Sequence, residues 1–231
     1  LDANHLGSAL TLVETPSKTP ILLNLHAKSS KTNPAKGTSL LVGPNSSGKN
    51  VLADHLDNQA GRYGNRTFII ERNQASKIYV LASGNSDYFV IEPESKGKLS
   101  LNPLQLKDNE KNRQFVRDWL AHLVLKPNET ILPSEILEQL NECVAYNFEH
   151  LEQKYRVLSN AVKLLPVDFE RWAELRVWLK GGNTRADGQF AWMFDNEHDS
   201  MSLGFDKVGF DVTYLLDSVE EHYATPLYMY I

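Results

Sequence analysis

One short segment of the sequence has the residue types and the spacing that bind phosphate groups. Residues 43–50 match the pattern G-x-x-x-x-G-K, in which backbone N–H groups of a loop and of the following helix face a phosphate. The N-terminus of that helix adds about half a positive charge, and Lys49 would add a full charge beside the β- and γ-phosphates of a nucleotide. The candidate nucleotide contacts are Gly43, Pro44, Asn45, Ser46, Ser47, Gly48, Lys49 and Asn50.

Two positions of this loop depart from the pattern of a hydrolysing enzyme. A Ser or Thr hydroxyl usually follows the lysine and binds Mg²⁺, whereas this chain has Asn50, whose amide oxygen lies on a longer stem. Ser46 stands where many such loops have glycine, and a positive φ would cost on the order of 1 kcal/mol there. We therefore expect nucleotide binding to survive, Mg²⁺ coordination to be weakened, and hydrolysis to be impaired.

Hydrolysis would also need an acidic side chain at the end of a strand, to hold the metal ion and to orient water. Glu71 follows an apolar run and could contact metal-bound water, or it could be a solvated acid at a strand end. Asp217 follows the run 212–216, which we expect to be a structural strand or the start of a helix rather than a magnesium-ligand strand. The sequence therefore identifies no catalytic residue. The seven histidines show no spacing typical of a metal site.

A phosphate loop of this kind needs a buried strand before it and a helix after it. The apolar run 39–42 is expected to be that strand, buried in a parallel sheet. Residues 51–56 have a helical apolar stripe, and the helix should end near Gly61 or Gly64. Further strands are expected at 9–13, 21–25, 67–70 and 208–212, and a hairpin at 78–81 and 88–91.

The middle of the chain is predicted to be helical. Apolar residues recur at helical spacing in four segments, at 115–124, 134–148, 157–165 and 169–179. Ser134 and Asp168 are candidate N-caps of the second and the fourth helix. Trp119, Trp172 and Trp178 lie on these helices, and we expect them to pack in a core rather than to form a partner surface.

Composition limits the class of protein. The 231 residues are 42% hydrophobic and 23% charged, which is ordinary for a folded chain and excludes wholesale disorder. No apolar run is long enough for a transmembrane helix. Cys143 is the only cysteine, which excludes an intramolecular disulfide and fits a reducing cytosol. The first residues are unlike a signal peptide, and since residue 1 is not Met, we expect the chain to begin within a longer protein.

Charge is unevenly distributed along the chain. Residues 1–50 have five Lys and Arg against two Asp and Glu, whereas residues 187–222 have one against nine. This asymmetry fits one end that meets an anion, and it also fits two solvated faces of opposite sign. An acidic half argues against general nucleic-acid binding, so no direct nucleic-acid partner is expected.

Several short motifs recur in an order that is typical of one protein family. The motifs are 6–12, 19–20, 24–26, the phosphate loop 43–50, 99–104, 133–136, 209–212, 215–217 and 225–226. In this order the chain resembles the large P-loop ATPase of type IV secretion and conjugation systems, the CagE/TrbE family, which is the fourth component of the VirB system. The resemblance covers essentially all of the chain.

The resemblance implies an α/β fold with a RecA-like, mostly parallel sheet and an inserted all-helical lobe. Residues 1–107 would be the front part of the nucleotide-binding domain, 108–181 the helical lobe, and 182–231 the return to the core, truncated before the Walker B acids. In a RecA-like sheet the phosphate-loop strand, here 39–42, would lie centrally, and the sheet is expected to be incomplete at its C-terminal end. The resemblance also implies an ATP-binding motor that energises assembly of the channel or pilus and transport of substrate.

The same resemblance implies partners and a location. Other type IV secretion subunits would be partners, a homo-oligomer is expected because family members form hexamers, and the chain would be cytoplasmic and peripheral on the inner face of the bacterial cytoplasmic membrane. Besides positions 46 and 50, this chain has Glu71-Arg72-Asn73-Gln74-Ala75 where the family usually has an Asp-x-Asp-x-Gly-like stretch. Three hypotheses stay open: a weakly active or inactive relative, an active ATPase completed by residues outside this chain, and a non-catalytic scaffold subunit.

Overall fold

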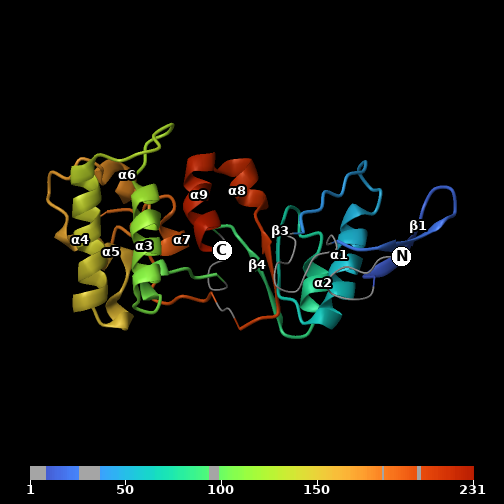
Figure 1. Cartoon of the computed structure of the whole chain (residues 1–231). Coiled ribbons are helices and arrows are strands. Elements are labelled where there is room, and N and C mark those ends of the chain that lie inside the picture. Colours follow the sequence, from blue (N-terminus) through green and yellow to red (C-terminus); the bar gives the residue numbers. More distant parts are fainter. Residues whose placement is uncertain (1–8, 26–36, 94–98, 184, 202–203) are drawn as a thin grey trace. The chain divides into compact units, whose positions relative to one another are not determined.

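The computed structural model describes residues 9–25, 37–93, 99–183, 185–201 and 204–231. The chain divides into two compact units. The first comprises Leu1–Tyr88 and Gly204–Phe210, and the second comprises Phe89–Leu203 and Asp211–Ile231. Figure 1 shows strands concentrated in the former and helices in the latter. The domain boundaries expected from the resemblance, at 107 and 181, stay a prediction.

The first unit begins with an antiparallel hairpin. Strand β1 (Thr11–Glu14) pairs with β2 (Pro20–Leu23), and the register places Leu12 opposite Leu22. Both strands agree with the predicted ranges 9–13 and 21–25 to within two residues. The turn is closed by the Thr15 side chain, whose Oγ1 accepts a hydrogen bond of 3.0 Å from the Thr19 amide.

A parallel sheet of three strands follows. It consists of β3 (Thr67–Glu71), β4 (Ser86–Val90) and β5 (Lys207–Asp211), in the order β3-β5-β4. At the start of the strands, the Thr67 amide donates to the Asp206 carbonyl and the Asp206 amide to the Asn85 carbonyl, both at 2.9 Å. Because the starts of all three strands lie together, the strands run in one direction. The predicted α/β class with a parallel sheet is confirmed.

Strand β5 is suited to the central position by its sequence. Val208 and Phe210 are buried, and Gly209 lies against the ring of Tyr88. A Cβ at position 209 would come within 2.4 Å of Tyr88 Cδ2, so no larger residue fits between the strands without displacing this ring. The predicted strand at 208–212 is confirmed.

The expected strand at 39–42 is not formed. Residues 37–44 have no assigned secondary structure, and Leu40 and Val42 are 89% and 78% exposed. A short apolar run becomes a strand only when the backbone of a neighbour pairs with it, which the run itself does not determine. In the described part of the chain, β3 is the edge of the sheet on one side. The prediction of a central strand at 39–42 is therefore wrong for this structure.

The predicted hairpin at 78–81 and 88–91 is also wrong, because its first half is helix α2 (Lys77–Leu81). Asn73 and Gln74 take left-handed φ values of 67° and 53°, and the chain reverses there. Glu71 then accepts hydrogen bonds from the Ser76 amide at 2.9 Å on both carboxylate oxygens, which fixes the entry into the helix. Helix α2 thus connects two parallel strands, a connection that a hairpin turn could not make.

Helix α1 (Lys49–Ala60) follows the phosphate loop, as predicted. A short 3₁₀ turn, η1 (Gly61–Tyr63), extends it, and Gly64 ends this turn in the left-handed conformation at φ 69°. The prediction that this helix ends near Gly61 or Gly64 is therefore confirmed.

The second unit contains most of the core. Its helices are α3 (Glu110–Leu123), α4 (Ser134–His150), α5 (Leu158–Ala161), α6 (Trp172–Arg176), α7 (Ala191–Phe194), α8 (Thr213–Ser218) and α9 (Glu221–Tyr230). Its 3₁₀ turns are η2 (Pro103–Gln105), η3 (Gln153–Tyr155) and η4 (Val162–Leu164). Trp119 and Trp178 are fully buried among Phe190 and Phe194. The expectation that these two tryptophans pack in a core is confirmed.

Two helix starts differ from the prediction. Ser134 is the first residue of α4 rather than its N-cap, because Pro133 holds the extended backbone that precedes the helix. The fourth helix begins at Trp172 and is shorter than expected, since the Phe169 amide and Trp172 Nε1 both bond to the Pro166 carbonyl. Asp168 lies within this turn, at residues 166–169, and the N-cap residue of the helix is Arg171 instead.

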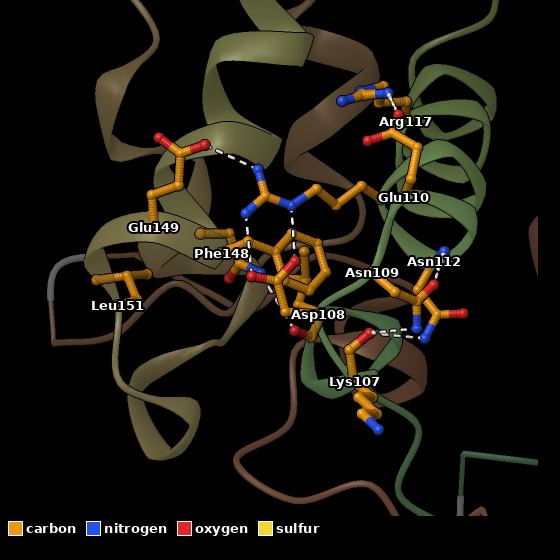
Figure 2. Close-up of polar contacts among 12 residues, drawn as sticks. Lys107, Asp108, Asn109, Glu110, Asn112, Arg117, Phe148, Glu149 and Leu151 are labelled. Atoms are coloured by element: carbon orange, nitrogen blue, oxygen red, sulfur yellow. Dashed lines mark hydrogen bonds and ion pairs between the residues drawn. The ribbon is translucent and has the colours of Figure 1, made fainter.

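An arginine cluster fixes the ends of α3 and α4. Arg113 donates to both Asp108 oxygens, at 2.6 and 3.0 Å, and to Glu149 at 2.8 Å, and its guanidinium lies 5.5 Å from the ring centre of Phe148. Figure 2 shows Asp108, Phe148 and Glu149 gathered at this point. Arg156 bonds to the carbonyls of Phe148 and Leu151, which satisfies groups left free at the end of α4.

The helices of the described residues include none with both the length and the apolar character that a membrane span requires.

Candidate functional site

The predicted phosphate loop leads directly into α1. Gly48 is the N-cap residue, with φ 83° and ψ 17°, and its carbonyl accepts from the Leu52 amide at 2.9 Å. Among the described residues, no side chain caps this end of the helix, and its first turn has no acidic residue. The first N–H groups of a helix have no partner within it, so this end of α1 offers donors and a positive dipole to an anion.

The backbone of the loop explains which positions need glycine. Gly48 is in the left-handed region, and a Cβ on Gly43 would lie 2.7 Å from Ser47 Oγ. Ser46 also has a positive φ, of 61°. The suspicion that Ser46 occupies a glycine conformation is therefore correct, and the strain is on the order of 1 kcal/mol.

Lys49 lies folded over the loop. Its Nζ donates hydrogen bonds to the carbonyls of Gly43 and Pro44, at 2.8 and 2.7 Å. These two bonds close the loop on itself and place a positive charge at its centre. A phosphate that entered the loop would be a better acceptor than either carbonyl, because the bond would then join two charged groups.

Asn50 and Glu71 line the same groove. Its volume is about 480 Å³, and its other lining residues are Ala53, Asp54, Asp57, Ile69, Ile70, Arg72 and Ser76. Asp54 stands one helical turn after Asn50. Burial, together with the charges of Glu71 and Asp57, raises the pKa of the Asp54 carboxyl. Two carboxylates, Asp54 and Asp57, therefore line this groove from the same helix as Asn50.

Glu71 is not the solvated strand-end acid that was one of its two predicted roles, and its contact with metal-bound water stays a prediction. Its two oxygens accept the Ser76 amide, and Tyr88 OH donates to one of them at 2.6 Å. The carboxylate is half-buried and organises the turn into α2, so it is not a solvated acid. Among the described residues, no group of three or more His, Cys, Asp or Glu side chains could hold a metal ion.

Asp217 lies on the exposed side of α8, within a helix rather than at the end of a strand. Most of the acids at 187–222 have partners inside the chain. Asp187 accepts the Gly181 amide, Asp195 those of Ser159 and Lys180, and Asp211 that of Thr213. Several acids of this segment therefore have structural roles within the chain.

The structure adds one residue that the sequence did not indicate. Asp57, two turns into α1, is half-buried and accepts hydrogen bonds from four side chains, one of them 150 residues away in the sequence. A partner so distant leaves no local pattern, so only the spatial arrangement reveals it.

Two type IV secretion system proteins resemble this chain in sequence over its whole length. No family model matches the chain. The type IV secretion system protein virB4 of Bartonella henselae is 26% identical over 240 residues, which covers 100% of this chain and 27% of that protein. PtlC of Bordetella pertussis, also a type IV secretion system protein, is 25% identical over 243 residues and is covered to 29%.

This chain resembles VirB4 over its whole length. The structure of VirB4 of Thermoanaerobacter pseudethanolicus superposes with a TM-score of 0.65 at 15% identity, covering 99% of this chain and 63% of that one. The α/β fold is therefore shared with VirB4, and the family resemblance predicted from the ordered motifs is confirmed. The chain spans about a quarter of the length of the curated VirB4 relatives. The eight loop residues stay candidate nucleotide contacts.

Proposed function

We propose that this chain is the nucleotide-binding part of a VirB4-like motor component of a type IV secretion system, which energises assembly of the channel or pilus and transport of substrate. The observation that supports this most directly is the loop 43–50. Gly48 opens an uncapped helix N-terminus, and Lys49 lies over the loop at hydrogen-bonding distance from its carbonyls. Together these groups suit the phosphates of ATP.

The same loop supports binding more strongly than hydrolysis. Asn50 replaces the hydroxyl that would bind Mg²⁺, and Glu71 is engaged by Ser76 and Tyr88. Phosphoryl transfer depends on charges placed around the γ-phosphate, so a weak metal site removes most of the rate. We therefore propose that ATP is bound with little help from Mg²⁺ and is turned over slowly or not at all by this chain.

Partners and location follow from the same proposal. The chain would contact other type IV secretion subunits, form a homo-oligomer, and lie in the cytoplasm against the inner face of the cytoplasmic membrane. Direct nucleic-acid binding is not expected, because residues 187–222 have nine Asp and Glu against one Lys and Arg.

Nucleotide binding can be tested with a fluorescent ATP analogue. The unaltered chain should bind the analogue and release it when ATP is added, whereas Lys49→Ala should weaken binding by about tenfold or more, equivalent to about 1.4 kcal/mol. Lys154→Ala is the matched control, since Lys154 is an exposed lysine far from the loop in sequence, where it pairs with Glu152 and lies 4.8 Å from the ring centre of Tyr155. Equal affinity for all three proteins would show that the loop is not the binding site. Phosphate release measured on the same samples should stay at background.

A scaffold function is the second candidate. It is favoured by the exposed apolar side chains of the first unit, among them Leu40, Val42, Phe68 and Ile70. A protein that is used only for subunit contacts would assemble with the other secretion proteins equally well with and without Lys49→Ala. A motor component would assemble but would no longer support secretion.

A further inference from the structure

Helix α1 is held in place by few apolar contacts. None of its residues is buried; Leu52 and Leu56 are half-buried, and Val51 is 74% exposed. A helix of twelve residues is marginal in water by itself and depends on tertiary contacts for a fixed position. Among the described residues, polar contacts therefore contribute strongly to the position of α1.

Asp57 provides that fixed point. Its Oδ1 accepts hydrogen bonds from Asn65 Nδ2 at 3.1 Å and from Thr67 Oγ1 at 2.6 Å. Its Oδ2 accepts from Tyr79 OH at 2.8 Å and from Lys207 Nζ. One carboxylate thus joins α1 to the segment before β3, to β3 itself, to α2 and to β5.

The charges of this cluster are matched. The side chains of Lys207 and Asp57 are only 13% and 16% exposed, and Lys207 Nζ lies 3.9 Å from the ring centre of Tyr79. Burial acts to raise the pKa of Asp57, but the hydrogen bonds from Lys207, Thr67 and Tyr79 outweigh it and lower the pKa. The carboxylate is therefore ionised, and removing its cation would leave an unbalanced charge in a nearly buried site.

We propose that Asp57, paired with Lys207, is a positioning residue that fixes α1 on β5 and α2 and thereby sets the aim of the phosphate loop. Asp57 stands about two turns after Lys49 on the same rigid helix, so a tilt of α1 displaces both Lys49 and the N–H groups at Gly48–Asn50. The part of this inference that concerns nucleotide rests on the proposed function. The anchoring of α1 does not.

Amide exchange and affinity for the ATP analogue, both measured on the intact chain, test the anchoring of α1 and its effect on the phosphate loop separately. Lys207→Met keeps most of the apolar stem beside Tyr79 and removes the charge. Tyr79→Phe removes a single hydroxyl, and it serves as the second variant if Lys207→Met folds poorly. We expect faster amide exchange in residues 50–60 for both variants, and an affinity for the fluorescent ATP analogue about tenfold lower for Lys207→Met. The double variant Asp57→Asn, Lys207→Met should lose no more affinity than the worse single one, because the two side chains act as a pair.

Arg113→Met is the matched control. This variant breaks the ion pairs of Arg113 with Asp108 and Glu149 in the second unit. The Arg113 side chain is 20% exposed there. The variant should leave both exchange in residues 50–60 and analogue affinity unchanged. Exchange in α1 that is equal in the unaltered chain and in Lys207→Met would overturn the anchoring, and faster exchange with unchanged affinity would overturn its effect on the phosphate loop. If the unaltered chain binds no analogue, the proposed function is wrong and its nucleotide part falls with it, while α1 exchange still decides the anchoring.

Discussion

Ser46 lies in the left-handed region because the loop must turn there before α1 begins. The sequence could predict this strain, since the position of Ser46 within the motif fixes the local backbone. It could equally predict that Asn50 would follow the lysine at the start of a helix. It could not predict the role of Glu71, because the Ser76 amide can donate to this carboxylate only where Asn73 and Gln74 reverse the chain.

Replacing Ser46 with glycine should stabilise the first unit. Relief of left-handed strain is worth about 1–2 kcal/mol, and the extra freedom of glycine in the unfolded chain takes back about 0.4–1 kcal/mol. Ser46→Gly should therefore slow amide exchange in residues 49–60 relative to the unaltered chain. Ser47→Gly is the control, because Ser47 is not among the positive-φ residues and should show only the entropic loss. Faster exchange in Ser46→Gly would contradict the strain argument.

Cys143 should behave as an inert core residue. It is buried on α4, and burial, with a smaller effect from the Glu142 charge, raises the pKa of its thiol to about 12. Because only the thiolate reacts, the native chain at pH 8 should react with an aromatic disulfide reagent at least about 100-fold more slowly than the urea-unfolded chain. Rapid reaction under native conditions would mean that the helical unit opens around α4.

The elements of the two units were predictable to different degrees. Helices α3 and α4 each follow from apolar spacing within one segment, so α4 agrees with its predicted range to within two residues, and α3 begins five residues before its own. The segments 39–42 and 78–81 have apolar runs as typical of a strand as 67–70 does, yet only 67–70 pairs with a neighbour. Pairing depends on β5, which is distant in sequence, so a local pattern cannot decide it.

This difference predicts unequal protection of the two units. Leu40 and Val42 lie outside any strand, and Phe68 and Ile70 on the edge strand β3 are 47% and 52% exposed. Amides of 39–42 and 67–70 should exchange much faster than those of 134–148 in monomeric protein, and the chain should self-associate at high concentration through this apolar edge. Equal protection of the three segments would contradict this assignment of the edge.

At the scale of the whole molecule, the ordered motifs predicted the VirB4 resemblance and the α/β class, because both depend on residues spread along the entire chain. The division into units and the Asp57–Lys207 pair depend on contacts between distant segments and were not predictable. All four tryptophans, at 119, 172, 178 and 192, lie in the second unit, so their fluorescence reports on the second unit alone. Variants of the loop must therefore be followed by other probes.

The central claim is that ATP is held by the phosphate loop without effective help from Mg²⁺. Titration of the fluorescent ATP analogue with Mg²⁺ present, and again with the metal removed by a chelator, tests it most directly. The unaltered chain should show affinities equal within about twofold, and Asn50→Thr, which restores the hydroxyl, should gain about tenfold from Mg²⁺. A tenfold gain from Mg²⁺ in the unaltered chain would show that Asn50 is a competent metal ligand and would contradict the account.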